Sequence, residues 1–148
     1  MRKGLKEKLE KLSREQLLDL LETLCGISEA QNMLKLMVLP TKRDIDRALG
    51  KFRSRCEIYI CNSCSMRDYD RMCAALEPLY AAYKYADAKT SAYIIYGIHS
   101  ALYDNDILDQ EYSDIMADLL GDLESILKAS PEVLSEDERQ SYLALVQE

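Results

Sequence analysis

The stretch "TSAYIIYGIHSALY", residues 90–103, contains no charged side chain, and it decides the fold. A helix that is apolar on all of its faces is a helix that other helices surround. The stretch is also shorter than the roughly 20 apolar residues that a helix needs to cross a bilayer. We therefore predict that residues 90–103 form a central helix and that the protein has no membrane partner.

The composition extends the helical prediction to the whole chain. Only 5 glycines and 3 prolines occur among the 148 residues, and 48% of the residues are hydrophobic. Few glycines and prolines are therefore available to form the turns that connect strands. A chain of this length usually folds as one domain. We predict an all-α fold, a single-domain bundle of about six to seven helices. The domain 1–148 would comprise short N-terminal helices (1–40), a core of long helices (41–129) and a short C-terminal helix (130–148).

Capping signals predict where the N-terminal helices begin and end. "SREQ", which starts at Ser13, is a capping box, and Gly26 is a natural residue to end the helix that follows. "SEAQ", which starts at Ser28, repeats the device and predicts a helix that runs to Pro40.

Three stripes of apolar side chains predict the long helices around the central one. Each stripe recurs with the period of one helix face. The first follows the capping residue Thr41, the second contains Pro78, and the third follows Asp109. Because proline lacks a backbone donor, we predict a kink or a break near Glu77. The stripes are Ile45, Leu49, Phe52, Cys56 and Tyr59; Tyr69, Met72, Cys73, Leu76 and Tyr80; and Tyr112, Ile115, Met116, Leu119, Leu123 and Ile126.

Four of the 5 cysteines fall within residues 56–73. Cys56, Cys61 and Cys64 have the spacing CxxxxCxxC of plant-type iron–sulfur sites. However, the bulky "EIYI" between the first two continues a helical stripe, and no second CxxC or histidine pair completes a zinc site. We predict no cofactor and no metal. A metal- or thiol-dependent protein that uses Cys61 and Cys64 is the alternative.

The sequence offers no set of residues that is typical of a catalytic centre. His99 is the single histidine, and it lies in the apolar stretch, where a packed side chain is expected. Neither a GxSxG nucleophile motif nor a GxxxxGK[ST] phosphate loop is present. The odd number of cysteines indicates reduced thiols, as in the cytoplasm. We therefore predict a cytoplasmic protein that is not an enzyme.

Charge is distributed unevenly along the chain. Residues 1–74 contain 15 Lys and Arg against 11 Asp and Glu, a net of +4, whereas residues 75–148 contain 4 against 15, a net of −11. The basic charge concentrates on the predicted helix 42–55, and acidic residues recur along the last long helix. Either surface could contact a partner of opposite charge. The basic candidates are Lys42, Arg43, Arg47, Lys51 and Arg55, and the acidic candidates are Glu111, Asp114, Asp118 and Asp122.

These observations favour a non-enzymatic protein that binds another macromolecule, most simply another protein. The acidic C-terminal half and the 10 tyrosines would supply contacts, since tyrosine is common at interfaces. Nucleic-acid binding through the basic helix 42–55 is the alternative. Self-association into a homo-oligomer is compatible with either prediction.

Overall fold

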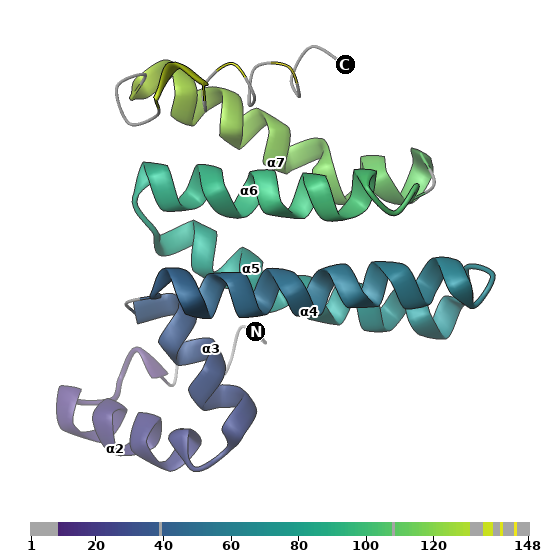
Figure 1. Ribbon diagram of the computed structural model, residues 1–148. Coiled ribbons are helices and arrows are strands. Elements are labelled where there is room, and N and C mark those ends of the chain that lie inside the picture. The colour runs from purple at the N-terminus through teal and green to yellow at the C-terminus, as the bar shows by residue number, and fades with distance from the viewer. Residues whose placement is uncertain are drawn as a thin grey trace. The chain divides into compact units, whose positions relative to one another are not determined.

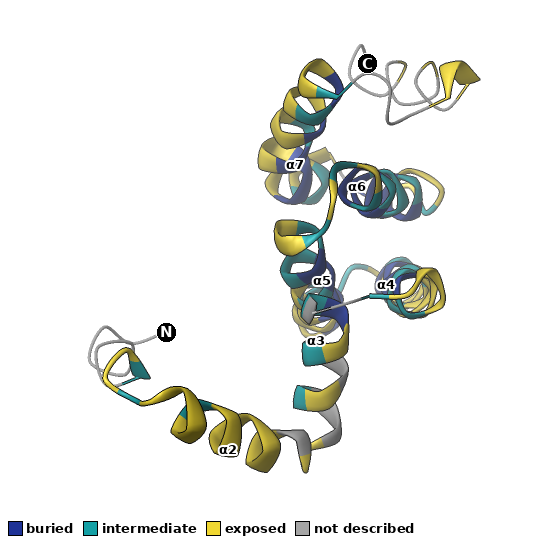
Figure 2. Cartoon of the chain, turned by 90° about the vertical axis from the view of Figure 1, so that its left-hand side faces the viewer, coloured by how far each residue is buried: buried dark blue, intermediate teal, exposed yellow. Residues whose placement is uncertain are grey.

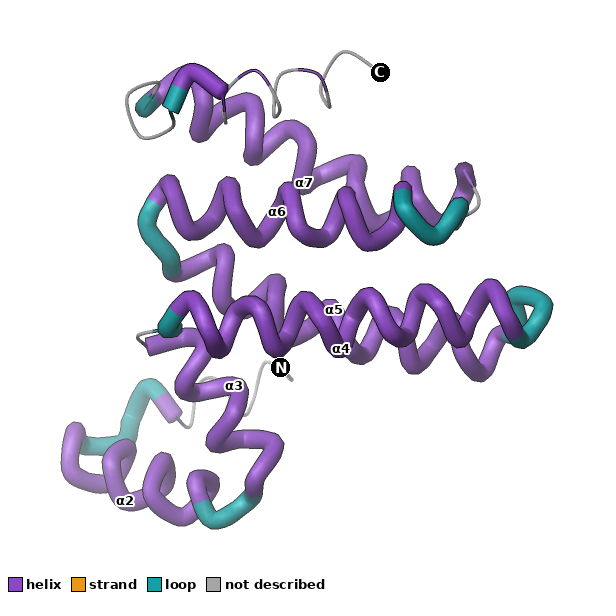
Figure 3. The backbone as a smooth tube through the Cα atoms, in the orientation of Figure 1, coloured by secondary structure: helices purple, strands orange, loops and turns teal. Residues whose placement is uncertain are grey.

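The structure, a computed structural model, describes residues 9–38, 40–107 and 109–130, together with 135–137, 140 and 144. Within these residues it contains six helices, α2 to α7, and no strand (Figure 1 and Figure 3). The all-α prediction is confirmed. The predicted C-terminal helix lies largely outside the described residues.

The chain falls into two compact units, Met1–Lys35 and Leu36–Glu148, and each is described by itself. The arrangement as a single domain therefore stays a prediction. In the first unit, α2 spans Arg14–Cys25, with Ser13 as its N-cap and Gly26 as its C-cap. The Ser13 hydroxyl accepts from the backbone N–H of Gln16 at 3.2 Å, and the Gln16 side chain accepts from the Ser13 N–H at 2.9 Å. The predicted capping box is confirmed.

Helix α3 spans Ser28–Val38 and crosses from the first unit into the second. A cap at Ser28 predicts that the helix starts at Glu29. In the structure the helix starts one residue earlier, at Ser28 itself. Its C-terminal turn contributes Leu36 to the core of the second unit.

The second unit contains the four long helices α4 (Lys42–Cys61), α5 (Met66–Tyr85), α6 (Ala88–Tyr103) and α7 (Asp109–Ala129). Helix α4 packs against α5 and α6, and α6 also packs against α5 and α7. Helix α6 thus packs against each of the other three long helices, which confirms the prediction for residues 90–103. Figure 2 shows that the buried residues of these helices face one another and the exposed residues face outward.

The predicted apolar stripes form the core of this unit. Phe52, Met72 and Leu102 are fully buried, and burial of one such side chain stabilises the fold by about 1.5–3 kcal/mol. Between α4 and α6 the Leu49 side chain packs directly on Gly97, because a Cβ on Gly97 would lie 2.5 Å from Cδ1 of Leu49. The absence of a side chain at Gly97 therefore makes room for Leu49.

The ends of the long helices agree with the capping and proline signals of the sequence except at two positions. Thr41 caps α4 through a capping box with Asp44, as expected. Helix α5 continues through Pro78 as one helix to Tyr85, so a break at Glu77 is wrong. The sequence pattern predicts Asp109 as the cap just before the last long helix. In the structure Asp109 is the first residue of α7.

Candidate functional site

The exposed face of α4 presents a line of cations. Its other face is buried in the core through Ile45, Phe52, Cys56 and Tyr59, which fixes the orientation of the helix. Three of the cations are exposed and the last is partly buried, and each is four residues from the next. We name this feature the basic row; its members are Arg43, Arg47, Lys51 and Arg55.

No cation of the basic row forms an ion pair or a hydrogen bond with any part of the chain that the structure describes. The nearby carboxylates have other partners. Asp44 accepts from the backbone N–H of Thr41 at 3.2 Å, and Asp46 accepts from the Tyr93 hydroxyl at 2.6 Å. Like charges at i,i+4 on a helix destabilise it by about 0.2–0.5 kcal/mol per pair. The basic row therefore lowers the stability of α4.

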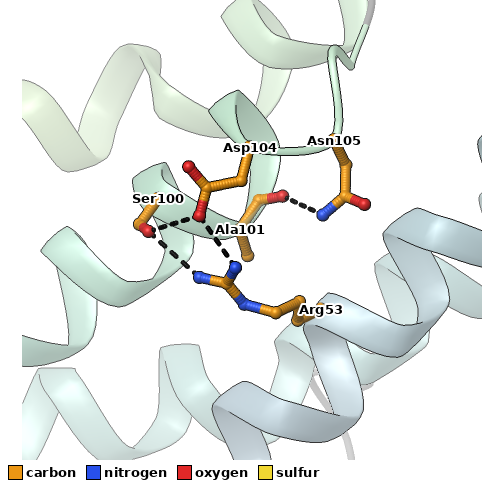
Figure 4. Close-up of polar contacts among 5 residues, drawn as sticks. All are labelled: Arg53, Ser100, Ala101, Asp104 and Asn105. Carbon is orange, nitrogen blue, oxygen red and sulfur yellow. Dashed lines mark hydrogen bonds and ion pairs between the residues drawn. The ribbon is translucent and has the colours of Figure 1, made fainter.

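The two other cations of the helix have intramolecular roles. The Lys42 ammonium lies 5.7 Å from the centre of the Tyr93 ring, a cation–π distance. Arg53 donates to Asp104 at 2.7 Å and to the Ser100 hydroxyl at 3.0 Å, so it links α4 to the end of α6 (Figure 4). Lys42, a predicted site residue, thus differs from the four members of the basic row.

The network around Arg53 also stabilises the turn after α6. The Ser100 hydroxyl donates to Asp104 at 3.0 Å, and the Asn105 side chain donates to the Ala101 carbonyl at 2.7 Å. Hydrogen bonds from Arg53 and Ser100 lower the pKa of the Asp104 carboxyl below its ordinary value. The acidic segment that precedes α7 is therefore a structured helix end.

The predicted acidic residues lie together along α7 at the edge nearest α5; we name them the acidic row, Glu111, Asp114, Asp118 and Asp122. Two of them accept hydrogen bonds from tyrosines of other helices. The Tyr59 hydroxyl donates to Glu111 at 2.9 Å, and the Tyr83 hydroxyl donates to Asp122 at 3.0 Å. These bonds attach α7 to α4 and α5. Asp114 and Asp118 are exposed to solvent.

Tyrosine hydroxyls supply many of the polar contacts between helices, a role that the sequence does not reveal. Besides Tyr59 and Tyr83, Tyr80 donates to the Ile115 carbonyl at 3.3 Å. Burial first, and then the neighbouring Glu111 carboxylate, raise the pKa of Tyr59. Burial and the contact with Cys73 raise the pKa of Tyr69 to about 12. These tyrosines are neutral packing residues with one hydrogen-bonding atom.

The cysteines at positions 56, 61 and 64 lie on α4 and in the turn that follows it, and they differ in burial. Cys56 lies in the core, where burial raises the pKa of its thiol to about 12. Helix α4 ends in a Schellman motif, in which Ser63 N–H donates to the Ile60 carbonyl at 3.2 Å and Cys64 N–H donates to the Tyr59 carbonyl at 2.9 Å. Cys64 is partly buried against the core, whereas Cys61 is exposed. Cys61 and Cys64 thus lie at the two ends of the turn that follows α4.

His99 is buried, and its Nδ1 lies 2.7 Å from the Tyr112 hydroxyl. Its ring stacks on Tyr103 with the ring centres 5.7 Å apart. These contacts agree with the prediction of a packed histidine. Among the residues that the structure describes, no three His, Cys, Asp or Glu side chains form a group that could hold a metal ion.

None of the described helices is both long enough and apolar enough to span a bilayer. Comparisons with protein-family models, with curated proteins and with solved structures give no match to this chain.

Proposed function

We propose that this protein is a non-enzymatic cytoplasmic binding module that recognises another protein through charged helix faces. The single observation that carries the proposal is the basic row. Four cations at i,i+4 spacing have no partner among the described residues, although their mutual repulsion destabilises the helix that carries them. Binding of an anionic surface would remove that repulsion.

A protein partner fits this face better than a single-stranded nucleic acid. Single-strand binding sites combine cations with exposed aromatic rings on which bases stack. The exposed residues of α4, which the structure describes in full, include no aromatic side chain. Ile58, 37% exposed, adds an apolar contact on the same side as Lys51 and Arg55. A small apolar contact among charges is typical of a protein interface.

Binding of double-stranded nucleic acid through the basic row is the second candidate function. Contacts with phosphate groups need cationic side chains and do not need aromatic ones. The overall charge of −7 opposes it, since a polyanion meets a predominantly acidic protein. The two candidates differ in their response to nuclease. A protein partner remains bound after nuclease treatment, whereas a nucleic acid is released.

The test is capture of the tagged full-length protein from its native lysate, with and without nuclease, with bound protein and nucleic acid measured together. The proposal predicts a specific protein that is retained after nuclease and released by about 0.5 M salt, where the Debye length falls to a few Å. Recovery of nucleic acid alone, lost on nuclease treatment, would move the function to the second candidate.

A further inference from the structure

We propose that the basic row binds the α7 face of a second copy of this chain, so that copies associate head to tail. This inference rests on the proposed function and names its partner.

The two rows match in charge and in helical repeat. The basic row spans residues 43–55, and the exposed part of the acidic row spans residues 114–122. At a rise of 1.5 Å per residue, they are about 18 Å and about 12 Å long. Both repeat once per helical turn, so helices laid side by side bring a cation close to a carboxylate at each turn.

Both faces also allow close approach of a helix. On the outer face of α7, small exposed residues recur every four positions beside the acidic row: Ser113, Ala117, Gly121 and Ser125. A Cβ on Gly121 would meet nothing within 4 Å. On α4, exposed Gly50 and Ser54 lie beside Lys51 and Arg55, and a Cβ on Gly50 would also meet nothing within 4 Å. Longer basic side chains can therefore reach across to the shorter carboxylates.

In one molecule no ion pair joins the two rows among the described residues, and the contact between α4 and the acidic row is the hydrogen bond from Tyr59 to Glu111. Helix α6 packs against both α4 and α7, and the exposed residues of α4 and α7 face outward on different sides of the unit (Figure 2). Contact between the rows therefore requires two molecules. Each association leaves one basic row and one acidic row free, so the interface is heterologous and permits further addition of copies.

A second copy suits the basic row better than a uniformly acidic partner. Asp114 and Asp118 are exposed, and like the basic row they are like charges at i,i+4 spacing. Head-to-tail contact relieves repulsion in both rows at once, whereas an external acidic partner relieves only one. Local pairing also persists despite the net charge of −7, because salt screens charges more than about 8 Å apart at physiological ionic strength.

The test is sedimentation velocity of the full chain at about 0.05 M and 0.5 M salt over a range of concentrations. We expect association that increases with concentration at low salt and disappears at high salt. Arg47→Glu/Lys51→Glu and Asp114→Lys/Asp118→Lys should each weaken association by about tenfold or more. An equimolar mixture of the two variants should associate again, because an unchanged acidic row then meets an unchanged basic row.

Matched controls reverse the same number of charges on other exposed positions: Lys84→Glu/Lys89→Glu and Asp70→Lys/Glu77→Lys. Both controls should associate like the wild type. A wild type that stays monomeric at low salt, or a mixture that fails to associate while both variants keep their helical circular dichroism, overturns the inference. If the monomeric wild type still retains a lysate protein that Arg47→Glu/Lys51→Glu loses, the proposed function stands and only its partner is wrong.

Discussion

The hydroxyl of Tyr59 on α4 donates to the carboxylate of Glu111 on α7 at 2.9 Å, across 52 positions of sequence. Tyr59 is only 2% exposed, and the second carboxylate oxygen of Glu111 is buried with no hydrogen-bond partner among the described residues. Glu111 is therefore a structural member of the acidic row. The surface available to a partner consists mainly of Asp114, Asp118 and Asp122.

Loss of the Tyr59 hydroxyl should destabilise the fold. Tyr59→Phe removes the donor of a partly buried carboxylate, so we expect the free energy of unfolding to fall by about 1–3 kcal/mol. Urea denaturation followed by circular dichroism measures the change. The control is Tyr83→Phe, whose bond to Asp122 lies at the exposed surface and should contribute about 0.5 kcal/mol. Equal losses in the two variants would contradict the structural role of Glu111.

Ser63→Gly should stabilise the protein. Ser63 has a φ of 57°, in the left-handed region, at the position of the Schellman motif where glycine is usual. The substitution removes the steric strain of a Cβ, and we expect a gain of about 1 kcal/mol and a melting temperature a few degrees higher. Ser63→Ala keeps the Cβ and should give no gain. A lower melting temperature for Ser63→Gly would show that α4 does not end in this motif.

Two glycines inside helices should respond oppositely to alanine. At Gly121 a Cβ meets nothing within 4 Å, so Gly121→Ala should stabilise α7 by up to about 1 kcal/mol. At Gly97 a Cβ would lie 2.5 Å from Leu49, so Gly97→Ala should destabilise the protein by about 1–2 kcal/mol. Thermal unfolding measures both changes. In a Leu49→Ala background Gly97→Ala should cost less stability than in the wild type, and an equal cost in both backgrounds would show that contact with Leu49 is not the cause.

Stability should fall in acid through Asp68. Hydrogen bonds from Ser65 and Asn62 lower the pKa of this carboxyl below its ordinary 3.8, and Arg71 contributes further. A carboxyl with a lowered folded pKa stabilises the fold above the unfolded pKa, and this contribution disappears as pH falls through the folded pKa. Asp68→Asn should therefore melt below the wild type at pH 7.

Melting temperatures measured at acid pH test whether the charge of Asp68 stabilises the fold. The difference in melting temperature between the wild type and Asp68→Asn should shrink as the pH falls from about 4 towards about 2. Asp70→Asn, an exposed neighbour on α5, serves as the control and should melt like the wild type at each pH. A difference that does not change with pH would show that the loss comes from packing and not from the charge of Asp68.

The sequence predicts the core because the periodicity of its apolar residues is local information. Phe52, Cys56 and Tyr59 are buried on α4 as their spacing indicates, and residues 90–103 are central because no charge interrupts them. Of the predicted kink or break near Glu77, the break is wrong, because tertiary packing maintains α5 as one helix through Pro78 although one backbone hydrogen bond is missing.

The partners of the charged residues could not be predicted, because they depend on which helices become neighbours. Arg53 and Arg55 are alike in sequence, yet Arg53 contacts Asp104 and Arg55 has no ion partner among the described residues. Glu111 and Asp118 are likewise equivalent in the sequence pattern. Only the position of α4 beside α7 shows that the first accepts a hydrogen bond from Tyr59.

Binding of the captured partner by two charge-reversed variants tests the central claim most directly. Arg47→Glu/Lys51→Glu alters the basic row, and Lys84→Glu/Lys89→Glu alters the net charge equally at exposed positions outside α4. We expect the first variant to lose the partner in the presence of nuclease and the second to retain it. Equal retention by both variants would contradict a function carried by the basic row.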